Sequence, residues 1–267
     1  MNEKNLDHLL QPICKIAVQA GSIINKYYKI NKDVVLKEDK SPLTKADLDS
    51  NKFIIQSLTE LDSSIPVLTE ESLVEWSVRK HWSQYWLVDP LDGTKEFLNQ
   101  NDEFTVNIAL IKNHNPVLGV IYAPALSTLY YAYKTQGSHK LFIEENLDSV
   151  SESIEIRTLN KKKTDHLRVF ESRSHSNVEF QKWVNENIKD YELIKKGSSL
   201  KFCELAEGTA DLYPRFGPTS EWDIAAGHII LIEAGGELES VDHEKILYNK
   251  KESVINPHFI ASCNLNN

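Results

Sequence analysis

The stretch of sequence that decides the fold reads Trp86-Leu87-Val88-Asp89-Pro90-Leu91-Asp92-Gly93-Thr94-Lys95. An apolar run typical of a strand leads directly into two carboxylates three residues apart. Proline fixes its own φ and glycine accepts a backbone shape that other residues resist, so the turn can direct both carboxylates and a carbonyl at one point. A plain strand-ending turn is the alternative, because Asp, Pro and Gly are ordinary turn residues. The Gly-Thr pair favours a ligand site, since it adds N–H groups for an anion at the end of a strand.

The composition is that of a globular protein. The chain has 267 residues, 41% of them hydrophobic and 26% charged, with a formal net charge of −9, which fits one large domain or two fused lobes. A nucleic acid polymer is not an expected partner, because contacts to its phosphates need clustered Lys and Arg. The three cysteines form no CxxC, so neither a disulfide framework nor a cysteine-ligated zinc site is expected. The apolar runs are shorter than the ~20 residues of a membrane helix and no signal peptide is visible, so we expect a cytoplasmic protein.

Apolar residues at three- and four-residue spacing predict a helix over residues 6–24 and a second helix after Thr44. The inner face of the second helix is expected to contain Leu48, Phe53, Ile54, Leu58 and Leu61. Short apolar runs predict strands at 34–36, 65–68, 85–88, 104–111, 117–122 and 129–133.

Residues 144–165 are polar, and they predict a boundary between two lobes of a single domain, roughly 1–145 and 146–267. Beyond the boundary, the pattern predicts strands at 167–170 and 210–213 and helices at 178–188, 200–206 and 224–234. Strands and helices alternate in both halves, which indicates a layered α/β or α+β architecture.

Three more acidic residues stand in motifs that suit a ligand site. Glu70 follows a short apolar run, Asp223 opens a predicted helix, and Asp47 lies three residues after Thr44. Each has a structural alternative, which is a loop acid for Glu70, an N-cap for Asp223 and a capping box for Asp47.

A metal site could be built from oxygen ligands alone, with no His or Cys. The candidate ligands are Glu70, Asp89, Asp92 and Asp223. Such a set selects hard cations, with Mg²⁺ the first choice. Carboxylates around one point repel each other, so a shared site implies cations, and two or three Mg²⁺ ions would bridge a phosphate, polarise it and generate hydroxide from water. In this interpretation Asp47 accepts a proton from Thr94, whose hydroxyl orients the attacking water.

The second half supplies candidates for binding an anion. They lie in Arg173-Ser174-His175, Gly197-Ser198-Ser199-Leu200-Lys201 and Tyr213-Pro214-Arg215. A Gly-Ser-Ser loop at a helix start can cradle an anion, and Lys201 and Arg215 can pair with a second phosphate. The alternatives are a helix cap for Ser198, surface charges for Lys201 and Arg215, a structural role for His175 and a core position for Tyr213.

Four motifs in order resemble the signatures of the inositol monophosphatase superfamily, whose members are Mg²⁺-dependent, lithium-sensitive phosphatases. They are Thr44-Lys45-Ala46-Asp47, Glu70-Glu71, residues 89–94 and residues 222–227. Within that superfamily, residues 85–97, 103–110, 197–203 and 212–218 are similar to the bacterial 3′(2′),5′-bisphosphate nucleotidases. Lys95-Glu96 stands where inositol phosphatases usually carry another pair, which argues against an inositol substrate.

This resemblance implies an αβαβα sandwich and a set of site residues. The implied metal ligands are Glu70, Asp89, the Leu91 carbonyl, Asp92 and Asp223. Asp47 and Thr94 would activate the attacking water, and the Gly93 and Thr94 amides would contact the scissile phosphate. The predicted substrate contacts are Gly93, Thr94, Ser174, His175, Ser198, Lys201, Tyr213, Arg215 and Asp223.

The implied reaction removes the 3′-phosphate of adenosine 3′,5′-bisphosphate to give AMP and phosphate in sulfur assimilation, and 3′-phosphoadenylyl sulfate would also be accepted. An inositol monophosphatase or a fructose 1,6-bisphosphatase is the alternative enzyme. A non-catalytic Mg²⁺ or nucleotide sensor is the alternative class. The resemblance further implies a monomer or homodimer, in the cytoplasm or at the inner face of the bacterial membrane.

Overall fold

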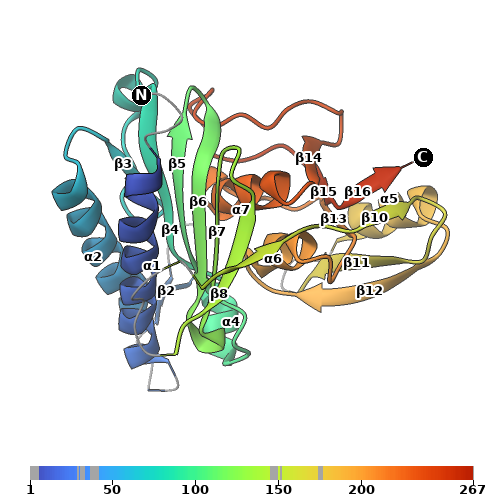
Figure 1. Cartoon of the computed structure of the whole chain (residues 1–267), viewed down its shortest axis with the longest axis horizontal. Coiled ribbons are helices and arrows are strands. Elements are labelled where there is room, and N and C mark those ends of the chain that lie inside the picture. The colour runs from blue at the N-terminus through green and yellow to red at the C-terminus, as the bar shows by residue number, and fades with distance from the viewer. Residues whose placement is uncertain are drawn as a thin grey trace.

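The computed structural model describes residues 6–28, 30, 34–36, 42–144, 150, 152–173 and 177–266. Its elements stack in five layers in the order helices, sheet, helices, sheet, helix (Figure 1). The αβαβα architecture predicted above is therefore confirmed.

The larger sheet has seven strands in sequence order, and only its first pair is parallel. The strands are β3 (Val67–Thr69), β4 (Gln84–Asp92), β5 (Thr105–Lys112), β6 (Asn115–Ala123), β7 (Thr128–Tyr133), β8 (Ser138–Phe142) and β9 (Ile154–Ile156). The helices α1 (Asp7–Tyr27) and α2 (Lys45–Leu61) cover one face of this sheet (Figure 1). A separate antiparallel pair, β1 (Val34–Leu36) and β2 (Pro42–Thr44), leads into α2.

The smaller sheet has five strands in the order β12, β11, β13, β15, β14. Their bounds are β11 (Leu167–Ser172), β12 (Tyr191–Lys196), β13 (Leu212–Arg215), β14 (Glu237–Ser240) and β15 (Phe259–Ser262). The helix α5 (Val178–Asn187) covers its outer face, while α6 (Leu200–Ala206) and α7 (Glu221–Glu233) lie between the two sheets (Figure 1). The remaining elements are α3 (Trp76–Arg79), α4 (Thr94–Asn99), the 3₁₀ helix η2 (Pro124–Leu126) and a parallel pair, β10 (Asn160–Lys162) with β16 (Asn264–Asn266).

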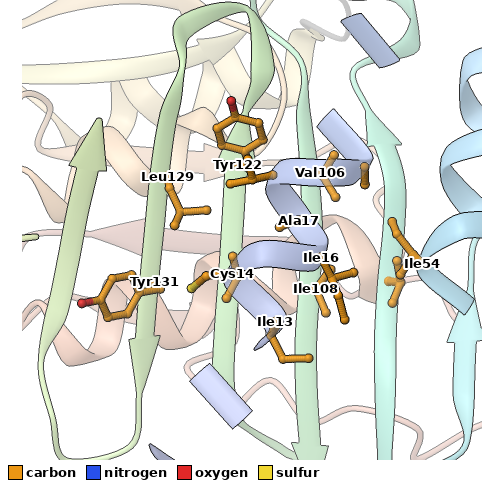
Figure 2. Close-up of a cluster of buried hydrophobic side chains, with 14 of the residues drawn as sticks. Ile13, Cys14, Ile16, Ala17, Ile54, Val106, Ile108, Tyr122, Leu129 and Tyr131 are labelled. Atoms are coloured by element: carbon orange, nitrogen blue, oxygen red, sulfur yellow. The ribbon is translucent and has the colours of Figure 1, made fainter. Parts of the chain in front are cut away.

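Both faces of β4 are buried, as its continuous apolar run predicts. Trp86 and Val88 face the core under α1 and α2, and the alternating residues Tyr85 and Leu87 face the core around α7. Figure 2 shows α1 placing Ile13 and its neighbours on the first of these faces. Because successive side chains of a strand point to opposite faces of the sheet, β4 contributes to two separate hydrophobic cores.

One prediction for α2 is wrong, because Leu48 is 48% exposed. The buried residues of this helix are Ala46, Asp47, Ser50, Asn51, Ile54 and Leu58. Its inner face therefore begins with polar side chains at the site end, and Leu48 is rotated away from it.

Helix α7 packs directly against the backbone of the large sheet. A Cβ added to Gly119 on β6 would lie 2.4 Å from Ile229 Cγ2 and 2.7 Å from the Ala226 carbonyl. The absence of a side chain at Gly119 thus lets the middle of α7 approach the sheet closely.

The strand predicted at 210–213 is found at Leu212–Arg215, and the helix predicted from residue 224 begins at Glu221. The large sheet extends to Ile156 and the five-stranded sheet begins at Leu167, so the change of sheet falls within the polar stretch 144–165. The three cysteines are free and buried. In the described ranges we find no helix with both the length and the apolar character needed to cross a bilayer.

Candidate active site

A cleft of about 320 Å³ opens between the two sheets at the carboxyl end of β4. Predicted residues that line it are Glu70, Asp89, Leu91, Asp92, Gly93, Thr94, Ser198, Lys201, Tyr213, Arg215 and Asp223. Asp47 is buried behind Thr94. Ser174 and His175 lie outside the described residues, so their predicted roles stay predictions.

The turn after β4 gains its shape from a bulge in the sheet. Asp89 pairs with Asn107 and Asp92 with Thr105, so β4 carries one extra residue there. Pro90 lies in this bulge, where the N–H that it lacks is not needed by the ladder. Gly93 has a φ of 87°, and a Cβ there would lie 2.9 Å from the Glu103 carbonyl. Both aspartates line the cleft, and their convergence on one ligand stays a prediction.

Among the four predicted carboxylate ligands, Asp89 is the one that is fully buried. It is buried, and one of its oxygens accepts a hydrogen bond from the Leu91 N–H at 3.0 Å. Burial raises the pKa of Asp89 well above its ordinary value, and the negative charges of Glu70, Asp92 and Asp223 raise it further. These four carboxylates are thus close enough to repel each other's charge.

Asp92 is held through one of its two oxygens. Its Oδ2 accepts a hydrogen bond from the Ser199 N–H at 2.6 Å, and the Ser199 hydroxyl lies 2.6 Å from the same oxygen. Thr105 Oγ1 and Asn107 Nδ2 lie 3.4 Å from the same oxygen. Thr105 and Asn107 carry no recognisable signal in the sequence, because both occupy ordinary positions of a predicted β-strand, and Ser199 is recognisable only as part of the Gly-Ser-Ser loop.

Asp223 lies in the first turn of α7. The N-cap of this helix is Ser220, and Ser220 N–H donates to Asp223 Oδ2 at 2.9 Å in a capping box. The alternative that Asp223 is itself the N-cap is wrong by three positions. Burial raises the pKa of Asp223 well above its ordinary value, as do the charges of Asp92 and Glu70.

Asp47 and Thr94, which the sequence predicts to act together, are joined by a hydrogen bond. Thr94 Oγ1 lies 3.2 Å from Asp47 Oδ1 and 3.3 Å from the Leu91 carbonyl. The other oxygen, Asp47 Oδ2, accepts from Thr44 N–H at 2.8 Å and from its hydroxyl at 2.5 Å. Asp47 therefore completes a capping box and contacts Thr94 at the same time. Burial raises the pKa of Asp47, against the lowering effect of the hydrogen bonds from Thr44.

Lys201 and Arg215 lie buried on the side of the cleft opposite the carboxylates. The alternative that they are exposed surface charges is therefore wrong. Lys201 is 4% exposed, and its ammonium donates to the Ser198 carbonyl at 2.6 Å and lies 5.0 Å from the centre of the Tyr213 ring. Arg215 is 6% exposed and donates from Nη2 to the Pro218 carbonyl at 2.9 Å. Its Nε is buried with no hydrogen-bond partner. A buried donor of this kind is normally satisfied, so the cleft suits an anionic ligand.

Ser198 and Tyr213 each line the cleft, as the predicted role in ligand binding requires, and each also has the local structural contacts of the alternative. Ser198 precedes the N-cap Ser199, and with a φ of 47° its hydroxyl accepts weakly from Leu200 N–H at 3.3 Å. Tyr213 packs edge-on against Phe202 and Phe259, yet it also lines the cleft. Tyr213 is thus a core residue with an edge available to a ligand.

The acidic residues fit a hard divalent cation in their chemistry. Asp89 and Asp223, whose pKa values are raised, need a positive charge nearby before they ionise beside the other carboxylates, and oxygen donors match Mg²⁺. Across the ranges that the structure describes, no three acidic, histidine or cysteine side chains are already arranged to hold an ion. The ligands would therefore adjust on binding, with Glu70, Asp89, Asp92, the Leu91 carbonyl and Asp223 holding the cations.

Comparison with known proteins agrees with this geometry. The model of the inositol monophosphatase family matches residues 5–264. The chain belongs to the inositol monophosphatase family.

Within this family, the chain is similar to the proteins named 3′(2′),5′-bisphosphate nucleotidase CysQ. It is 44% identical to that of Salmonella typhimurium, over 94% of this chain and 98% of the relative. It is 38% identical to that of Haemophilus influenzae, over 95% of this chain and 92% of the relative. The crystal structure of CysQ from Bacteroides thetaiotaomicron superposes with a TM-score of 0.85 at 39% identity, covering 97% of this chain and 98% of the other. The resemblance drawn from the four motifs is confirmed.

We expect divalent cations to reverse the pH dependence of stability. Because the pKa values of Asp89 and Asp223 are raised in the folded state, the metal-free protein should lose stability as the pH rises from about 4 through those values. Bound Mg²⁺ stabilises the ionised carboxylates, so the gain in melting temperature on adding Mg²⁺ should grow between about pH 5 and pH 8.

Thermal melts in Mg²⁺ and in EDTA across this range measure the difference. Asp89→Asn should remove most of the Mg²⁺-dependent gain, while Asp165→Asn, in a turn of the polar stretch, should keep it. A gain that does not change with pH would contradict a carboxylate metal site.

Proposed function

We propose that this chain is a Mg²⁺-dependent 3′(2′),5′-bisphosphate nucleotidase that converts adenosine 3′,5′-bisphosphate to AMP and phosphate. The observation that carries the proposal is the pairing, in one cleft, of a carboxylate cluster with two buried cationic side chains, Lys201 and Arg215. A substrate with two phosphates gives both groups a partner. The names of the CysQ relatives support the same reaction.

The chain's own residues account for orientation and proton transfer. Asp47 accepts the hydrogen bond of the Thr94 hydroxyl, which leaves a lone pair of Thr94 to accept from the attacking water. Gly93 is the N-cap of α4 in a left-handed conformation, and we assign the start of that helix to the scissile phosphate. We infer that Asp47 and Thr94 take the proton of the water as it attacks in line with the leaving O3′.

Bound Mg²⁺ would supply a Lewis acid and a water of lowered pKa, with two or three ions sharing the carboxylates. This contribution has to be large. Enhancements for hydrolysis of phosphate monoesters reach ~10²¹-fold, whereas acid–base catalysis typically gives ~10²–10⁴-fold. Electrostatic stabilisation by the metal–carboxylate cluster must therefore lower most of the barrier.

The second phosphate is assigned to the cationic side of the cleft. The Lys201 ammonium donates one hydrogen to the Ser198 carbonyl, and a further carbonyl, of Lys196, lies 3.4 Å away, so at least one of its three hydrogens stays available. Arg215 has its unpartnered Nε. Both groups are buried, so their charge is weakly screened, and an anion within reach would gain a charge-assisted hydrogen bond from each.

Two of the rival functions leave part of the site unexplained, and the third, a fructose 1,6-bisphosphatase, also has a substrate with two phosphates and is distinguished by the substrate panel below. An inositol monophosphatase would need the carboxylates but has no second phosphate for Lys201 and Arg215. A non-catalytic sensor would not need the Asp47–Thr94 hydrogen bond. We assign to the enzyme a cytoplasmic role in sulfur assimilation, as a monomer or homodimer, with 3′-phosphoadenylyl sulfate as a second substrate and inhibition by lithium.

Phosphate release over a panel of substrates tests the function. Adenosine 3′,5′-bisphosphate should exceed inositol 1-phosphate and fructose 1,6-bisphosphate in kcat/KM. Asp89→Asn should lower turnover by about 10³-fold or more, because it removes a ligand of the cluster. Thr94→Ala should lower kcat by about 10²–10⁴-fold while Mg²⁺ still binds.

The exposed change Leu48→Ala serves as the control and should leave turnover unchanged. Near-normal turnover in Asp89→Asn, or a preference for inositol 1-phosphate, would contradict the assignment.

The pH dependence of KM tests the role of Lys201. Burial lowers the pKa of Lys201 to about 8, so its ammonium loses its proton earlier than that of an ordinary lysine. The KM for adenosine 3′,5′-bisphosphate should therefore rise as the pH passes about 8, whereas the KM for 3′-AMP, which lacks the 5′-phosphate, should not. Lys201→Gln should raise the first KM by about 10–100-fold and abolish its dependence on pH.

Lys182→Gln, at a position 71% exposed, provides the matched control and should behave as the wild type. Equal pH profiles for the two substrates would show that Lys201 does not bind the 5′-phosphate.

A further inference from the structure

Ser199 connects the second half of the chain to two of the acidic residues. It is 2% exposed and is the N-cap of α6. Its N–H and its hydroxyl both lie 2.6 Å from Asp92 Oδ2, and the same hydroxyl lies 2.6 Å from the Asp223 carbonyl. One residue thus contacts the end of β4 and the first turn of α7.

The Ser199 hydroxyl is oriented by a buried partner. Asn107 Nδ2 donates to Ser199 Oγ at 2.9 Å, and Thr105 Oγ1 donates to Asn107 Oδ1 at 2.9 Å. Asn107 and Thr105 are buried on β5. Since Asn107 occupies a lone pair of Oγ, the single hydrogen of the hydroxyl is left for Asp92 or for the Asp223 carbonyl.

These contacts determine how Asp92 can bind a cation. Its Oδ2 already accepts the Ser199 N–H, so that oxygen faces the protein and Oδ1 is the oxygen left for the cleft. The same hydroxyl lies 2.6 Å from the Asp223 carbonyl, so Ser199 also contacts the start of α7 at this point. Groups that hold a metal ligand in orientation typically contribute 10–100-fold to metal affinity.

The turn that carries Ser199 is itself held in place from both sides. Gly197 N–H donates to Glu103 Oε2 at 2.7 Å, and Lys201 Nζ donates to the Ser198 carbonyl at 2.6 Å. The turn also touches the β4 loop, since a Cβ on Gly93 would lie 3.2 Å from Ser198 Cβ. A shift of this turn would therefore move Ser199 relative to Asp92.

We propose that Ser199 is a positioning residue that aligns Asp92 and Asp223 for binding divalent cations. The inference deepens the proposed function and rests on it for the identity of the cation. It gives the side chain of Ser199 a role distinct from phosphate binding by its neighbours, because its polar atoms are directed at the carboxylate side of the cleft.

Calorimetric titration of Mg²⁺ into substrate-free protein tests this role. Ser199→Ala should weaken Mg²⁺ binding by about 10–100-fold and raise the Mg²⁺ concentration needed for half-maximal turnover by a similar factor. At saturating Mg²⁺, the KM for adenosine 3′,5′-bisphosphate should stay within about twofold of the wild type. Asn107→Ala, which removes the partner that orients the hydroxyl, should weaken Mg²⁺ binding in the same direction.

Ser138→Ala is the matched control. Ser138 is also fully buried and its hydroxyl also donates to a carbonyl of α7, that of Ile230, but it lies on β8 and does not line the cleft. This variant should lower the melting temperature without changing Mg²⁺ affinity.

If Ser199→Ala binds Mg²⁺ as tightly as the wild type, the inference is overturned. If Ser199→Ala does not fold, wild-type Mg²⁺ affinity in Asn107→Ala overturns it instead. Either result would leave the proposed function standing, provided that the wild type hydrolyses the nucleotide. Conversely, a wild type that binds Mg²⁺ without hydrolysing the nucleotide would contradict the proposed function, and the affinity of Ser199→Ala would still decide the role of Ser199.

Discussion

The mutual repulsion of buried carboxylates is the constraint on which the site depends. Asp89 is buried among the charges of Glu70, Asp92 and Asp223, each of which raises its pKa. The fold brings these groups together from the end of β3, from β4 and from the first turn of α7, and α7 packs closely on Gly119 of the same sheet. Such a cluster lowers the stability of the fold until cations neutralise its charge. The same carboxylates would therefore drive the binding of the cations on which the proposed catalysis depends.

Local stabilising motifs also serve the site. Asp47 and Asp223 are each the third residue of a helix and close a capping box with the N-caps Thr44 and Ser220. In Asp47, one oxygen satisfies the helix terminus and the other accepts from Thr94. A structural role and a functional role are therefore not alternatives at these positions, because a carboxylate has two oxygens and each can have its own partner.

Much of the fold and of the acidic site follows from short-range patterns in the sequence. The strand–turn motif at Asp89 depends on its own proline and glycine, so it could be predicted locally. The positions of Ser199 and Asn107 beside Asp92 could not, because they depend on pairing between segments far apart in the chain. Leu48 was misplaced for a related reason, since the buried face of α2 begins with polar residues that only the site explains. Strand β12 was missed because its sequence, YELIKK, is mostly polar and partly exposed.

The most direct test of the central claim is a crystal soaked in Mn²⁺, with the ions located by anomalous scattering. The account predicts ions at about 2.0–2.2 Å from carboxylate oxygens of Asp89 and Asp92, with Glu70 and Asp223 completing the cluster. Ions bound elsewhere, with the Asp89 carboxyl facing no metal, would contradict it.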